Sequence, residues 1–290
     1  MRRVMSVAVG AVALLLGGHR TPPPHTEDTS AVSNPDKRQP SRLPAQQLRV
    51  RILQSLPHDP RAFTQGLEMA NGMLYESTGG YGESAVMAGP AGKTPTVHAR
   101  LPARLFGEGI SVLGPRLWQL TWRDGIAVER DSRTLAERRR VTYTGEGWGL
   151  CHQRRDNRLV MSDGSALLTF RDPATFAPTG SLTVTEHGQA VPRLNELECA
   201  APDTVYANIY RTDRIVRIDT STGMVTGSID ATGLLTPRER PNAGPLNGIA
   251  VIPGTDEFLL TGKRWPKMFR VRFISDSAAM EDHADASAKA

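Results

Sequence analysis

Five short apolar segments of the chain begin with the same local pattern: a residue with a functional side chain, then a small or acidic residue, then Leu or Ile. The five copies, called signatures below, are Gln65-Gly66-Leu67, Glu108-Gly109-Ile110, Trp148-Gly149-Leu150, Asn195-Glu196-Leu197 and Asn247-Gly248-Ile249. Their first residues lie 43, 40, 47 and 52 positions apart. Carboxyl and carboxamide groups at equivalent positions of a repeat can hydrogen-bond a ligand and pass a proton.

A second set of functional residues follows four of the signatures. Trp122, Asp163, Tyr210 and Lys263 come 14 to 16 residues after the first residue of a signature. Each has an ordinary structural explanation when it is taken alone: a single Trp packs in a core, and a Lys extends its stem to reach solvent. Their coincidence at equivalent repeat positions favours one cavity that holds an acid, a base, carboxamides and aromatic rings.

Glu108 is the carboxylic acid at the first position of a signature, and Phe106 lies two residues before it. Apolar surroundings raise the pKa of a carboxyl group, because burial disfavours the charged form. Such a group can pass protons near neutral pH, whereas the alternative is a structural Glu bound to loop amides. The sequence has no His-x-His, His-Glu-x-x-His or Gly-x-Ser-x-Gly motif and no phosphate loop. Metal-dependent hydrolysis, serine esterase chemistry and nucleotide hydrolysis are therefore disfavoured.

The repeat also predicts the elements that position these residues. A period of about 40–50 residues between equivalent short strands is typical of β-propeller blades. Each signature is followed by turn residues and a second apolar strand, and Asp-x-x-Thr motifs at Asp131, Asp172 and Asp219 predict tight turns between two outer strands. No long apolar stripe of helical period occurs. The pattern indicates an all-β fold with four strands in each repeat.

Five signatures predict a five-bladed β-propeller. A strand predicted at 48–56 precedes the first signature, and the last blade lacks an outer strand after residue 273. We therefore expect the ring to be closed by the N-terminal strand joining the last blade, which also removes exposed sheet edges. The innermost strands of such a ring carry the signatures, so their first side chains should surround one channel.

The ends of the chain differ in composition from its middle. Arg2 and Arg3 precede a short apolar run that ends in Gly17-Gly18, the order of regions found in a cleaved signal peptide for export to the periplasm or beyond. The run is too short for a bilayer, and an uncleaved anchor or a buried helix is the alternative. The predicted organisation is a signal peptide at 1–18, a disordered linker at 19–46, a propeller catalytic domain at 47–274 and a disordered tail at 275–290.

Charge and cysteine content limit the partners. The formal charge is +5 and the sequence pI is about 9.5, but Lys and Arg are scattered instead of forming the stripe that nucleic acid requires. We expect no nucleic acid partner, no stable membrane insertion after signal cleavage, and a monomer. Cys151 and Cys199 follow two signatures closely. A disulfide between them and two buried free thiols both remain open.

Several motifs together resemble the plant-type glutaminyl-peptide cyclotransferases, which also occur in bacteria. The resemblance covers about residues 50 to 273. Its motifs are His58-Asp59-Pro60, Phe63-Thr64-Gln65-Gly66-Leu67, Phe106-Gly107-Glu108-Gly109-Ile110, Gly147-Trp148-Gly149-Leu150, Leu194-Asn195-Glu196-Leu197-Glu198, Thr212-Asp213-Arg214-Ile215, Leu246-Asn247-Gly248-Ile249-Ala250 and Thr261-Gly262-Lys263-Arg264-Trp265-Pro266-Lys267. The resemblance implies a five-bladed propeller that converts N-terminal glutamine of peptides and proteins to pyroglutamate, with release of ammonia and without a catalytic metal or other cofactor.

The resemblance also implies roles for matching residues. Glu108 would be the acid/base that takes a proton from the substrate α-amine and delivers one to the departing ammonia. The polar residues that would orient the amide and stabilise charge on its oxygen are Gln65, Asn195 and Lys263. The aromatic lining would consist of Phe63, Phe106, Trp122 and Trp148. Tyr210 stands where the family usually has Trp, and we expect it to contact the substrate.

Other interpretations of the sequence stay open. An exported propeller that binds peptide N-termini or sugars without chemistry would have the same aromatic cavity. A metal-dependent lactonase-type propeller is disfavoured, because the signatures supply one carboxylate at their first position. A structural cation in the channel is compatible with the sequence. We expect Glu198 to be structural, and Asp213 and Arg214 to form a structural ion pair.

Overall fold

The computed structural model describes residues 44–275, and the secondary structure of this part is strand apart from one 3-10 turn, η1 (Arg240–Asn242). The predicted signal peptide, nearly all of the predicted linker and the tail after residue 275 lie outside the described residues. The first and last strands reach Gln46 and Ser275, one residue beyond each predicted boundary of the folded domain. Among residues 44–275, no helix has the length and apolar character needed to cross a bilayer.

Three sheets contain four antiparallel strands each, in the order of the sequence. The first comprises β2 (Thr64–Ala70), β3 (Met73–Thr78), β4 (Ala85–Gly89) and β5 (Val97–Arg100). The second comprises β6 (Gly107–Leu113), β7 (Arg116–Thr121), β8 (Ile126–Asp131) and β9 (Glu137–Thr142). The third comprises β10 (Leu150–Gln153), β11 (Arg158–Ser162), β12 (Leu167–Arg171) and β13 (Pro178–Thr183).

The remaining strands belong to one ten-stranded sheet. One part of it is β16 (Leu194–Ala201), β17 (Thr204–Ile209), β18 (Arg214–Asp219) and β19 (Met224–Asp230), with the short strands β14 (Thr185–Glu186) and β15 (Gln189–Ala190) beside it. The other part is β20 (Leu246–Val251), β21 (Glu257–Gly262), β22 (Lys267–Ser275) and β1 (Gln46–Pro57). β1 pairs antiparallel with β22 along its length and parallel with β19 through Gln46–Arg49. The predicted pairing of the N-terminal strand with the last strand is therefore present.

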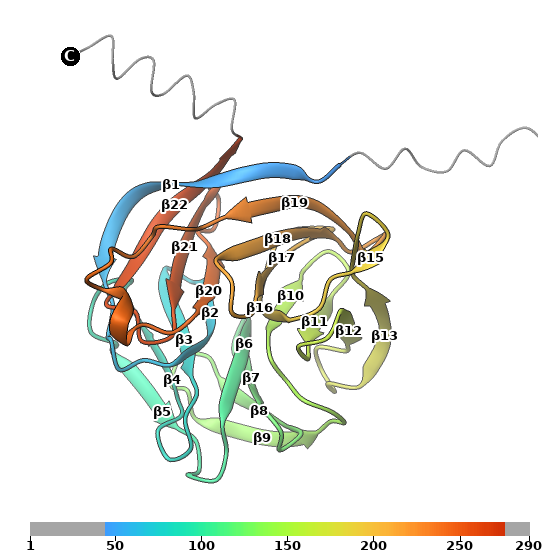
Figure 1. Cartoon of the computed structure of the whole chain (residues 1–290). Coiled ribbons are helices and arrows are strands. Elements are labelled where there is room, and N and C mark those ends of the chain that lie inside the picture. The colour runs from blue at the N-terminus through green and yellow to red at the C-terminus, as the bar shows by residue number, and fades with distance from the viewer. Residues whose placement is uncertain (1–43, 276–290) are drawn as a thin grey trace, which may run out of the picture. The chain divides into compact units, whose positions relative to one another are not determined.

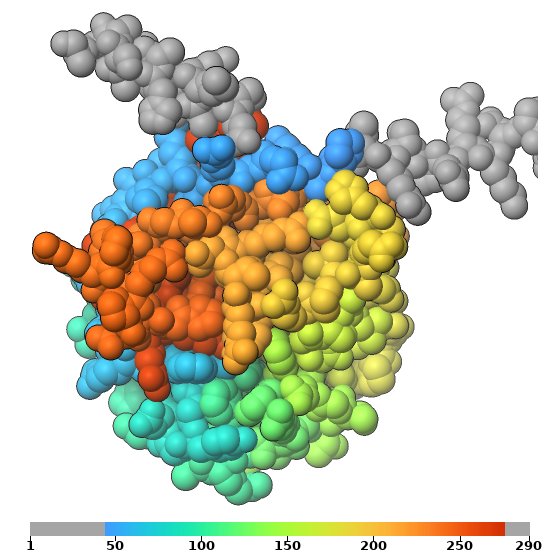
Figure 2. Space-filling view, in the orientation of Figure 1, coloured from blue at the N-terminus to red at the C-terminus, as the bar shows by residue number. Residues whose placement is uncertain are grey.

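The strands that carry the signatures lie toward the centre, and the fourth strands lie outside (Figure 1). β2 contacts β6, β6 contacts β10, β10 contacts β16, β16 contacts β20, and β20 contacts β2. Every residue of β6 is buried, whereas the charged strand β9 (Glu-Arg-Arg-Arg-Val-Thr) is largely exposed. Inner strands are enclosed on both faces and are mainly apolar outside a few buried polar residues, while outer strands tolerate charge. The space-filling view shows the compact outer surface that results (Figure 2).

Four of the five signatures coincide with irregularities in strand pairing. Register shifts fall between Thr64 and Gly66 in β2, between Gly107 and Ile110 in β6, between Leu194 and Leu197 in β16, and between Leu246 and Ile249 in β20. A β-bulge bends a strand and re-aims a side chain, and it is common next to functional sites. The irregular position in each strand includes the first residue of its signature.

Glycine at the second signature position allows neighbouring inner strands to approach. A Cβ on Gly109 would lie 2.6 Å from the carbonyl oxygen of Trp148, and a Cβ on Gly149 would lie 2.1 Å from that of Asn195. The same approach lets the Gly109 amide donate to the Trp148 carbonyl at 2.7 Å. A side chain at either position would push two inner strands apart, so the small residue is required there.

The Asp-x-x-Thr motifs form the predicted turns. Asp131 and Asp172 lie at the ends of β8 and β12 or next to them, and each accepts hydrogen bonds from two amides and the Thr hydroxyl of its motif. Asp219 caps the turn between β18 and β19 by accepting bonds from the amide and hydroxyl of Ser221. The prediction of hairpins between outer strands is confirmed.

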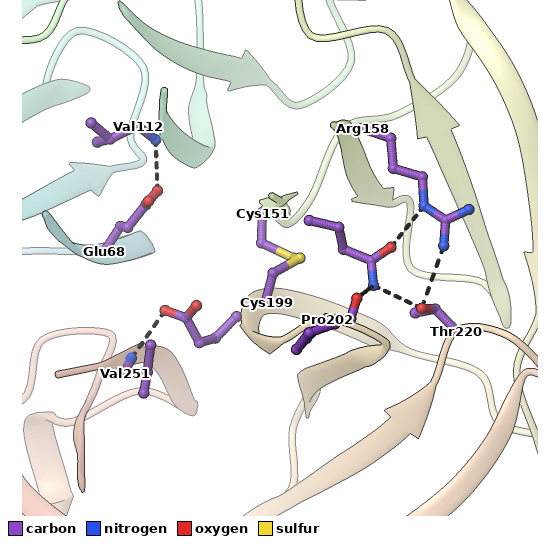
Figure 3. Close-up of a disulfide and its surroundings, with 10 residues drawn as sticks. Glu68, Val112, Cys151, Arg158, Cys199, Pro202, Thr220 and Val251 are labelled. Atoms are coloured by element: carbon purple, nitrogen blue, oxygen red, sulfur yellow. Dashed lines mark hydrogen bonds between the residues drawn. A yellow bond between two sulfur atoms is a disulfide. The ribbon is translucent and has the colours of Figure 1, made fainter. Parts of the chain in front are cut away.

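The open question about the cysteines is resolved in favour of a disulfide. Cys151 on β10 and Cys199 on β16 are bonded, with their Cα atoms 5.4 Å apart (Figure 3). The bond joins two neighbouring inner strands, one residue after the signature at Cys151 and two residues after it at Cys199. It therefore ties together two parts of the chain that are 48 residues apart.

Buried carboxylates provide further links between inner strands. Glu68 accepts a hydrogen bond of 2.7 Å from the Val112 amide, and Glu198 accepts one of 3.0 Å from the Val251 amide (Figure 3). Glu196 accepts from the amides of β2 and β20, at 3.2 and 2.8 Å. These bonds agree with a structural role for Glu198. Within residues 44–275, no group of three or more His, Cys, Asp or Glu side chains is arranged to hold a metal ion.

Candidate functional site

A pocket of about 270 Å³ lies where the inner strands begin. The nine residues that line it are Phe63, Gln65, Phe106, Glu108, Trp122, Trp148, Asn195, Tyr210 and Lys263. These are the nine residues singled out from the sequence, and they come from all three four-stranded sheets and from both parts of the larger sheet. The repeat spacing pointed to seven of them, and the family resemblance added Phe63 and Phe106.

A chain of hydrogen bonds fixes the polar floor of the pocket. Gln65 donates from Nε2 to Glu108 Oε1 at 3.0 Å, and its own Oε1 accepts from Asn247 Nδ2 at 3.3 Å. Asn247 also donates to the Thr64 carbonyl at 3.0 Å. Asn247 does not line the pocket, although its signature position suggested that it would. Its hydrogen bond to Gln65 Oε1 instead fixes the orientation of the Gln65 carboxamide. In this orientation the Gln65 NH₂ group points toward Glu108.

Glu108 is buried, with 4% of its surface exposed. Burial raises the pKa of its carboxyl group well above the ordinary value, the positive charge of Lys263 opposes this rise, and the negative charge of Glu146 adds to it. A carboxyl group with a raised pKa holds a proton more readily than an exposed one, which suits a group that accepts a proton in one step and donates it in another.

Lys263 lies against two aromatic rings at the pocket. Its Nζ is 4.9 Å from the ring centroid of Phe63 and 5.0 Å from that of Tyr210. Burial lowers the pKa of Lys263 to about 8, although the negative charge of Glu108 opposes the shift. The ammonium group is still charged at neutral pH, and its aromatic neighbours supply a weak cation site without neutralising it. A developing negative charge in the pocket would be attracted to it.

The aromatic rings that line the pocket form two groups, and the rings contact one another within each group. Phe106 contacts Phe63 at a centroid distance of 6.1 Å and Trp122 at 5.6 Å, and Trp148 meets Tyr210 edge to face at 5.4 Å. Gly164 leaves room for one of these rings, since a Cβ on Gly164 would lie 2.6 Å from the Trp148 ring. These rings make a narrow apolar slot above the polar floor, as expected for a site that binds the apolar part of a small side chain.

Glu146 is a residue that sequence reasoning missed. Its Oε2 accepts from the indole nitrogens of Trp122 at 2.7 Å and Trp148 at 3.0 Å, and its Oε1 accepts from Arg123 at 3.1 Å. Burial acts to raise the pKa of Glu146, but the hydrogen bonds from the two indoles and Arg123 lower it below the ordinary value. One ionised carboxylate therefore orients two walls of the pocket. Its position two residues before Trp148 was the available signal.

His58 and Glu76 form hydrogen bonds that hold the start of β2, the strand that carries Gln65. The ring of His58 contacts the Trp265 carbonyl through Nδ1 at 2.7 Å and Glu76 Oε1 through Nε2 at 3.0 Å. Thr64, which lies between the pocket residues Phe63 and Gln65, donates its hydroxyl to the same Glu76 oxygen at 2.7 Å. The motif that contains His58 is thus part of the scaffold that positions Gln65.

Asn195 brings an unused hydrogen-bonding atom to the pocket. Its residue is 1% exposed, and its Oδ1 is buried without a hydrogen-bond partner. A buried polar atom without a partner is unfavourable, and most such atoms in proteins are paired. Because Asn195 lines the pocket, a bound ligand with N–H groups can supply the missing partner.

Two expectations about neighbouring residues were wrong. Asp163 is not among the residues that line the pocket, because its carboxylate caps a turn by accepting from the amide and hydroxyl of Ser165. Asp213 and Arg214 do not pair with each other. Asp213 pairs with Arg240 at 3.1 Å, and Arg214 pairs with Glu186 at 2.6 Å. Asp213 lies in the bend before β18, Arg214 is the first residue of that strand, and each meets a partner from a different segment.

The arrangement combines a proton carrier, a cation and hydrogen-bonding amides within an apolar slot. Glu108 and Lys263 interact electrostatically, so the site can hold a proton near a position where charge develops. Gln65 and Asn195 can hold an amide group between them, and the rings exclude water from its apolar stem. This geometry suits an acyl transfer at a carboxamide in which one group both removes and delivers a proton.

Comparisons with known proteins agree with this geometry. The family model for glutamine cyclotransferase matches residues 27–273. A glutaminyl-peptide cyclotransferase of Arabidopsis thaliana is 35% identical over 237 residues, which are 79% of this chain and 72% of the relative. The crystal structure of Myxococcus xanthus glutaminyl cyclase superposes with a TM-score of 0.72 at 38% identity, over 80% of this chain and 99% of that one. The chain belongs to the glutamine cyclotransferase family.

Proposed function

We propose that this protein is a glutaminyl-peptide cyclotransferase, which converts the N-terminal glutamine of peptides and proteins to pyroglutamate and releases ammonia. Family membership and the similarity to enzymes with this name support the proposal. The observation that carries it is the buried carboxyl group of Glu108, bound by Gln65 in a pocket that is otherwise aromatic apart from Asn195 and Lys263.

The reaction needs one bond to form and one to break. The neutral α-amine nitrogen attacks the side-chain carboxamide carbon, and a bond between them closes a five-membered ring. Glu108 in its ionised form accepts a proton from this nitrogen. It then returns the proton to the carboxamide nitrogen, whose bond to the ring carbon breaks to release ammonia. The raised pKa of Glu108 suits both steps, because the carboxyl group must gain and lose the proton within one turnover.

The remaining polar residues act on the carboxamide. Lys263 attracts the negative charge that develops on the carboxamide oxygen, and Asn195 accepts a hydrogen bond from a substrate N–H group through the atom that has no partner in the free protein. Gln65 holds Glu108 in place. These contacts stabilise the charge distribution of the transition state more than that of the substrate.

The aromatic walls keep the substrate side chain folded. Phe63, Phe106, Trp122, Trp148 and Tyr210 bound the slot in which the two methylene groups of glutamine would pack. Holding amine and carboxamide within attacking distance supplies a large part of the acceleration of such an intramolecular reaction. Tyr210 is smaller than Trp and leaves more room on its side of the slot. None of the proposed steps uses a metal ion or a cofactor.

We also propose that the folded part is a five-bladed β-propeller whose ring is closed by β1. The contacts of the inner strands around a circuit and the antiparallel pairing of β1 with β22 support this arrangement. Residues 1–18 would be a cleaved signal peptide, the enzyme would be exported as a monomer, and residues 19–46 and 275–290 would be linker and tail. The predicted signal peptide and tail lie outside the described residues, as does nearly all of the linker.

Ammonia release is the direct test. The purified protein is incubated with a peptide that begins with Gln and with the same peptide beginning with Asn, and ammonia and product mass are followed. Cyclisation predicts one ammonia per Gln peptide, loss of the free N-terminus, and the same rate with a chelator present. If the Gln peptide binds to the protein but no ammonia is released, the protein is a non-catalytic binder of peptide N-termini. A propeller with a catalytic metal would lose activity in the chelator.

A further inference from the structure

Three arginine side chains stack against the aromatic walls of the pocket from outside. The pairs, with the distance from the guanidinium carbon to the ring centroid, are Arg123 over Trp122 at 3.9 Å, Arg211 over Tyr210 at 5.3 Å and Arg264 over Phe63 at 5.6 Å. All three arginines are exposed, whereas the polar floor of the pocket is buried. The mouth of the pocket is therefore bordered by guanidinium groups.

These arginines occupy one repeat position. Each is the second residue after the end of the second strand of its repeat, and the residue just before it, Trp122, Tyr210 or Lys263, lines the pocket. In the first and third sheets the same position is held by Gly80 and Gly164. The mouth thus has arginine at three of the five repeat positions and glycine at the other two. A peptide whose first residue is in the pocket therefore meets positive charge on some paths out of the mouth and none on others.

Two of the arginines adopt a backbone conformation that does not suit them. Arg211 has φ of 63° and Arg264 has φ of 59°, in the left-handed region where Gly or Asn is preferred. Gly80 and Gly164 have positive φ at the equivalent positions. A non-glycine residue in this conformation costs free energy. Its presence therefore favours a functional role for the arginine side chain.

The charges of Arg211 and Arg264 are not neutralised by neighbours. Arg123 pairs with Glu146 at 3.1 Å, but within residues 44–275 neither Arg211 nor Arg264 has an ion-pair partner. The acid nearest to Arg211 along the chain, Asp213, is already paired with Arg240. Two uncompensated guanidinium groups therefore flank the part of the mouth that lies beside Tyr210 and Lys263.

There is also room for a ligand on this side. A cavity of about 400 Å³ is bordered by Arg211 and Thr212 at one edge, and by Gly244 and Trp265 at another. Gly244 lies against the stem of Lys263, since a Cβ placed on it would be 3.0 Å from the Cβ of Lys263. The cavity therefore lies next to the pocket residue Lys263, and the Asp213–Arg240 ion pair also borders it.

We propose that Arg211 and Arg264 select substrates that carry a carboxylate on the second or third residue of the peptide, directly after the N-terminal glutamine. The inference rests on the proposed cyclotransferase function and names its preferred substrate class, acidic peptides. With the first residue in the pocket, an extended chain advances about 3.3–3.6 Å per residue, so the next two residues pass the mouth. A guanidinium group binds a carboxylate through two parallel hydrogen bonds, which makes Arg better suited to this selection than Lys.

A matched set of peptide amides tests the selection. Gln-Ala-Ala-amide, Gln-Glu-Ala-amide, Gln-Ala-Glu-amide and Gln-Lys-Ala-amide are compared by kcat/KM for ammonia release at low salt. At least one Glu peptide is expected to exceed the neutral peptide by about five- to tenfold, the ratio that two exposed charge pairs supply. The Lys peptide should fall below the neutral one, and added salt should reduce the differences.

Substitutions then assign the selection to the two arginines. Asn tolerates the left-handed conformation, so Arg211→Asn, Arg264→Asn and the double variant remove charge without new backbone strain. The acidic-to-neutral ratio of kcat/KM should fall in each single variant and approach one in the double variant. Arg133→Asn is the matched control: Arg133 is exposed in the turn between β8 and β9, at the end of the sheet away from the pocket, and its ratio should equal that of the parent.

The outcomes separate this inference from the proposed function. Cyclisation of all four peptides with equal kcat/KM overturns the selection and leaves the enzyme function standing. An acidic preference that persists in the double variant also overturns it, since the charge would then act from elsewhere. No cyclisation of any peptide overturns the proposed function itself. The ratio is independent of how much protein is folded, so a less stable double variant still gives a decisive answer.

Discussion

Gln65 and Glu108, 43 residues apart in the chain, are joined by a hydrogen bond of 3.0 Å at the base of an aromatic pocket. They occupy the same position in two successive repeats, and the bulges at these positions turn both side chains toward the centre. The bond places a neutral amide donor on a carboxyl group whose pKa is raised by burial. The proposed chemistry depends on this contact.

Glu108→Gln should abolish most of the activity and leave the fold intact. The amide has nearly the shape of the carboxyl group but cannot accept and return a proton, so kcat should fall by about 10²–10⁴-fold. Ammonia release measures the rate, and retained binding of a Gln peptide shows that the pocket persists. Cyclisation at the parental rate would remove Glu108 from the mechanism.

The pH dependence of kcat should be bell-shaped. Activity rises as Glu108 ionises, above the usual range for a carboxyl group because burial raises its pKa. Activity falls as Lys263 loses its proton, because its pKa is lowered to about 8 and only the charged form stabilises the oxygen. A profile of kcat from pH 5 to 10, spanning both limbs, checks this.

Lys263→Met assigns the alkaline limb. The Met side chain fills similar volume without a charge, so the fall above pH 8 should disappear and kcat should be lower throughout. Loss of the ammonium charge also removes an interaction that lowers the pKa of Glu108, so the acidic limb should move to higher pH. An alkaline limb that is unchanged in this variant would mean that another group titrates there.

Glu146→Ala should loosen the two tryptophan walls. Trp122 and Trp148 would each lose a hydrogen bond to an ionised acceptor, and a misplacement of about 1 Å in a site can reduce the rate about a hundredfold. We expect kcat/KM to fall about tenfold or more, with a changed tryptophan fluorescence spectrum.

Glu146→Gln is the informative companion. Its amide oxygen can still accept from the indoles, so the fall in kcat/KM should be smaller than in the Ala variant. Removal of the negative charge lowers the pKa of Glu108, so the acidic limb of the kcat profile should move to lower pH. If neither variant differs from the parent in rate or fluorescence, Glu146 does not position the walls.

Replacing both cysteines with Ser should destabilise the protein more than it affects catalysis. The disulfide closes a loop of 48 residues, and bonds of this kind contribute about 2–4 kcal/mol. The midpoint of thermal unfolding should fall by roughly 5–15 °C. Activity at 25 °C should remain, because Cys151 and Cys199 line a different pocket from the candidate site. Calorimetry of the parent with and without a reductant gives an independent measurement.

The repeat in the sequence predicted most of the candidate site. Spacing alone placed Gln65, Glu108, Trp148 and Asn195 at equivalent positions, and all four line one pocket. The fold class and the pairing of the N-terminal strand with the last strand followed from the same pattern. The position of a residue within its repeat follows from the order of strands and turns in that repeat. The local sequence determines this order.

Features that depend on contacts between loops could not be predicted. Glu146 stands two residues before its signature, as Phe63 and Phe106 do, but its role appears only when two indoles from different sheets lie within reach. The same limit explains the errors. Asp213 and Arg214 are adjacent and opposite in charge, yet each pairs with a residue from a distant part of the chain, Arg240 of η1 and Glu186 of β14 respectively.

The double pairing of β1 has a consequence for biosynthesis. The first described strand is hydrogen-bonded both to β19 and to β22, the last described strand. Lys263 lies just before β22, whereas Gln65 follows β1 by eight residues. The ribosome must therefore complete β22 before it can pair with β1, and a chain released before Lys263 has no assembled pocket with which to modify other nascent peptides.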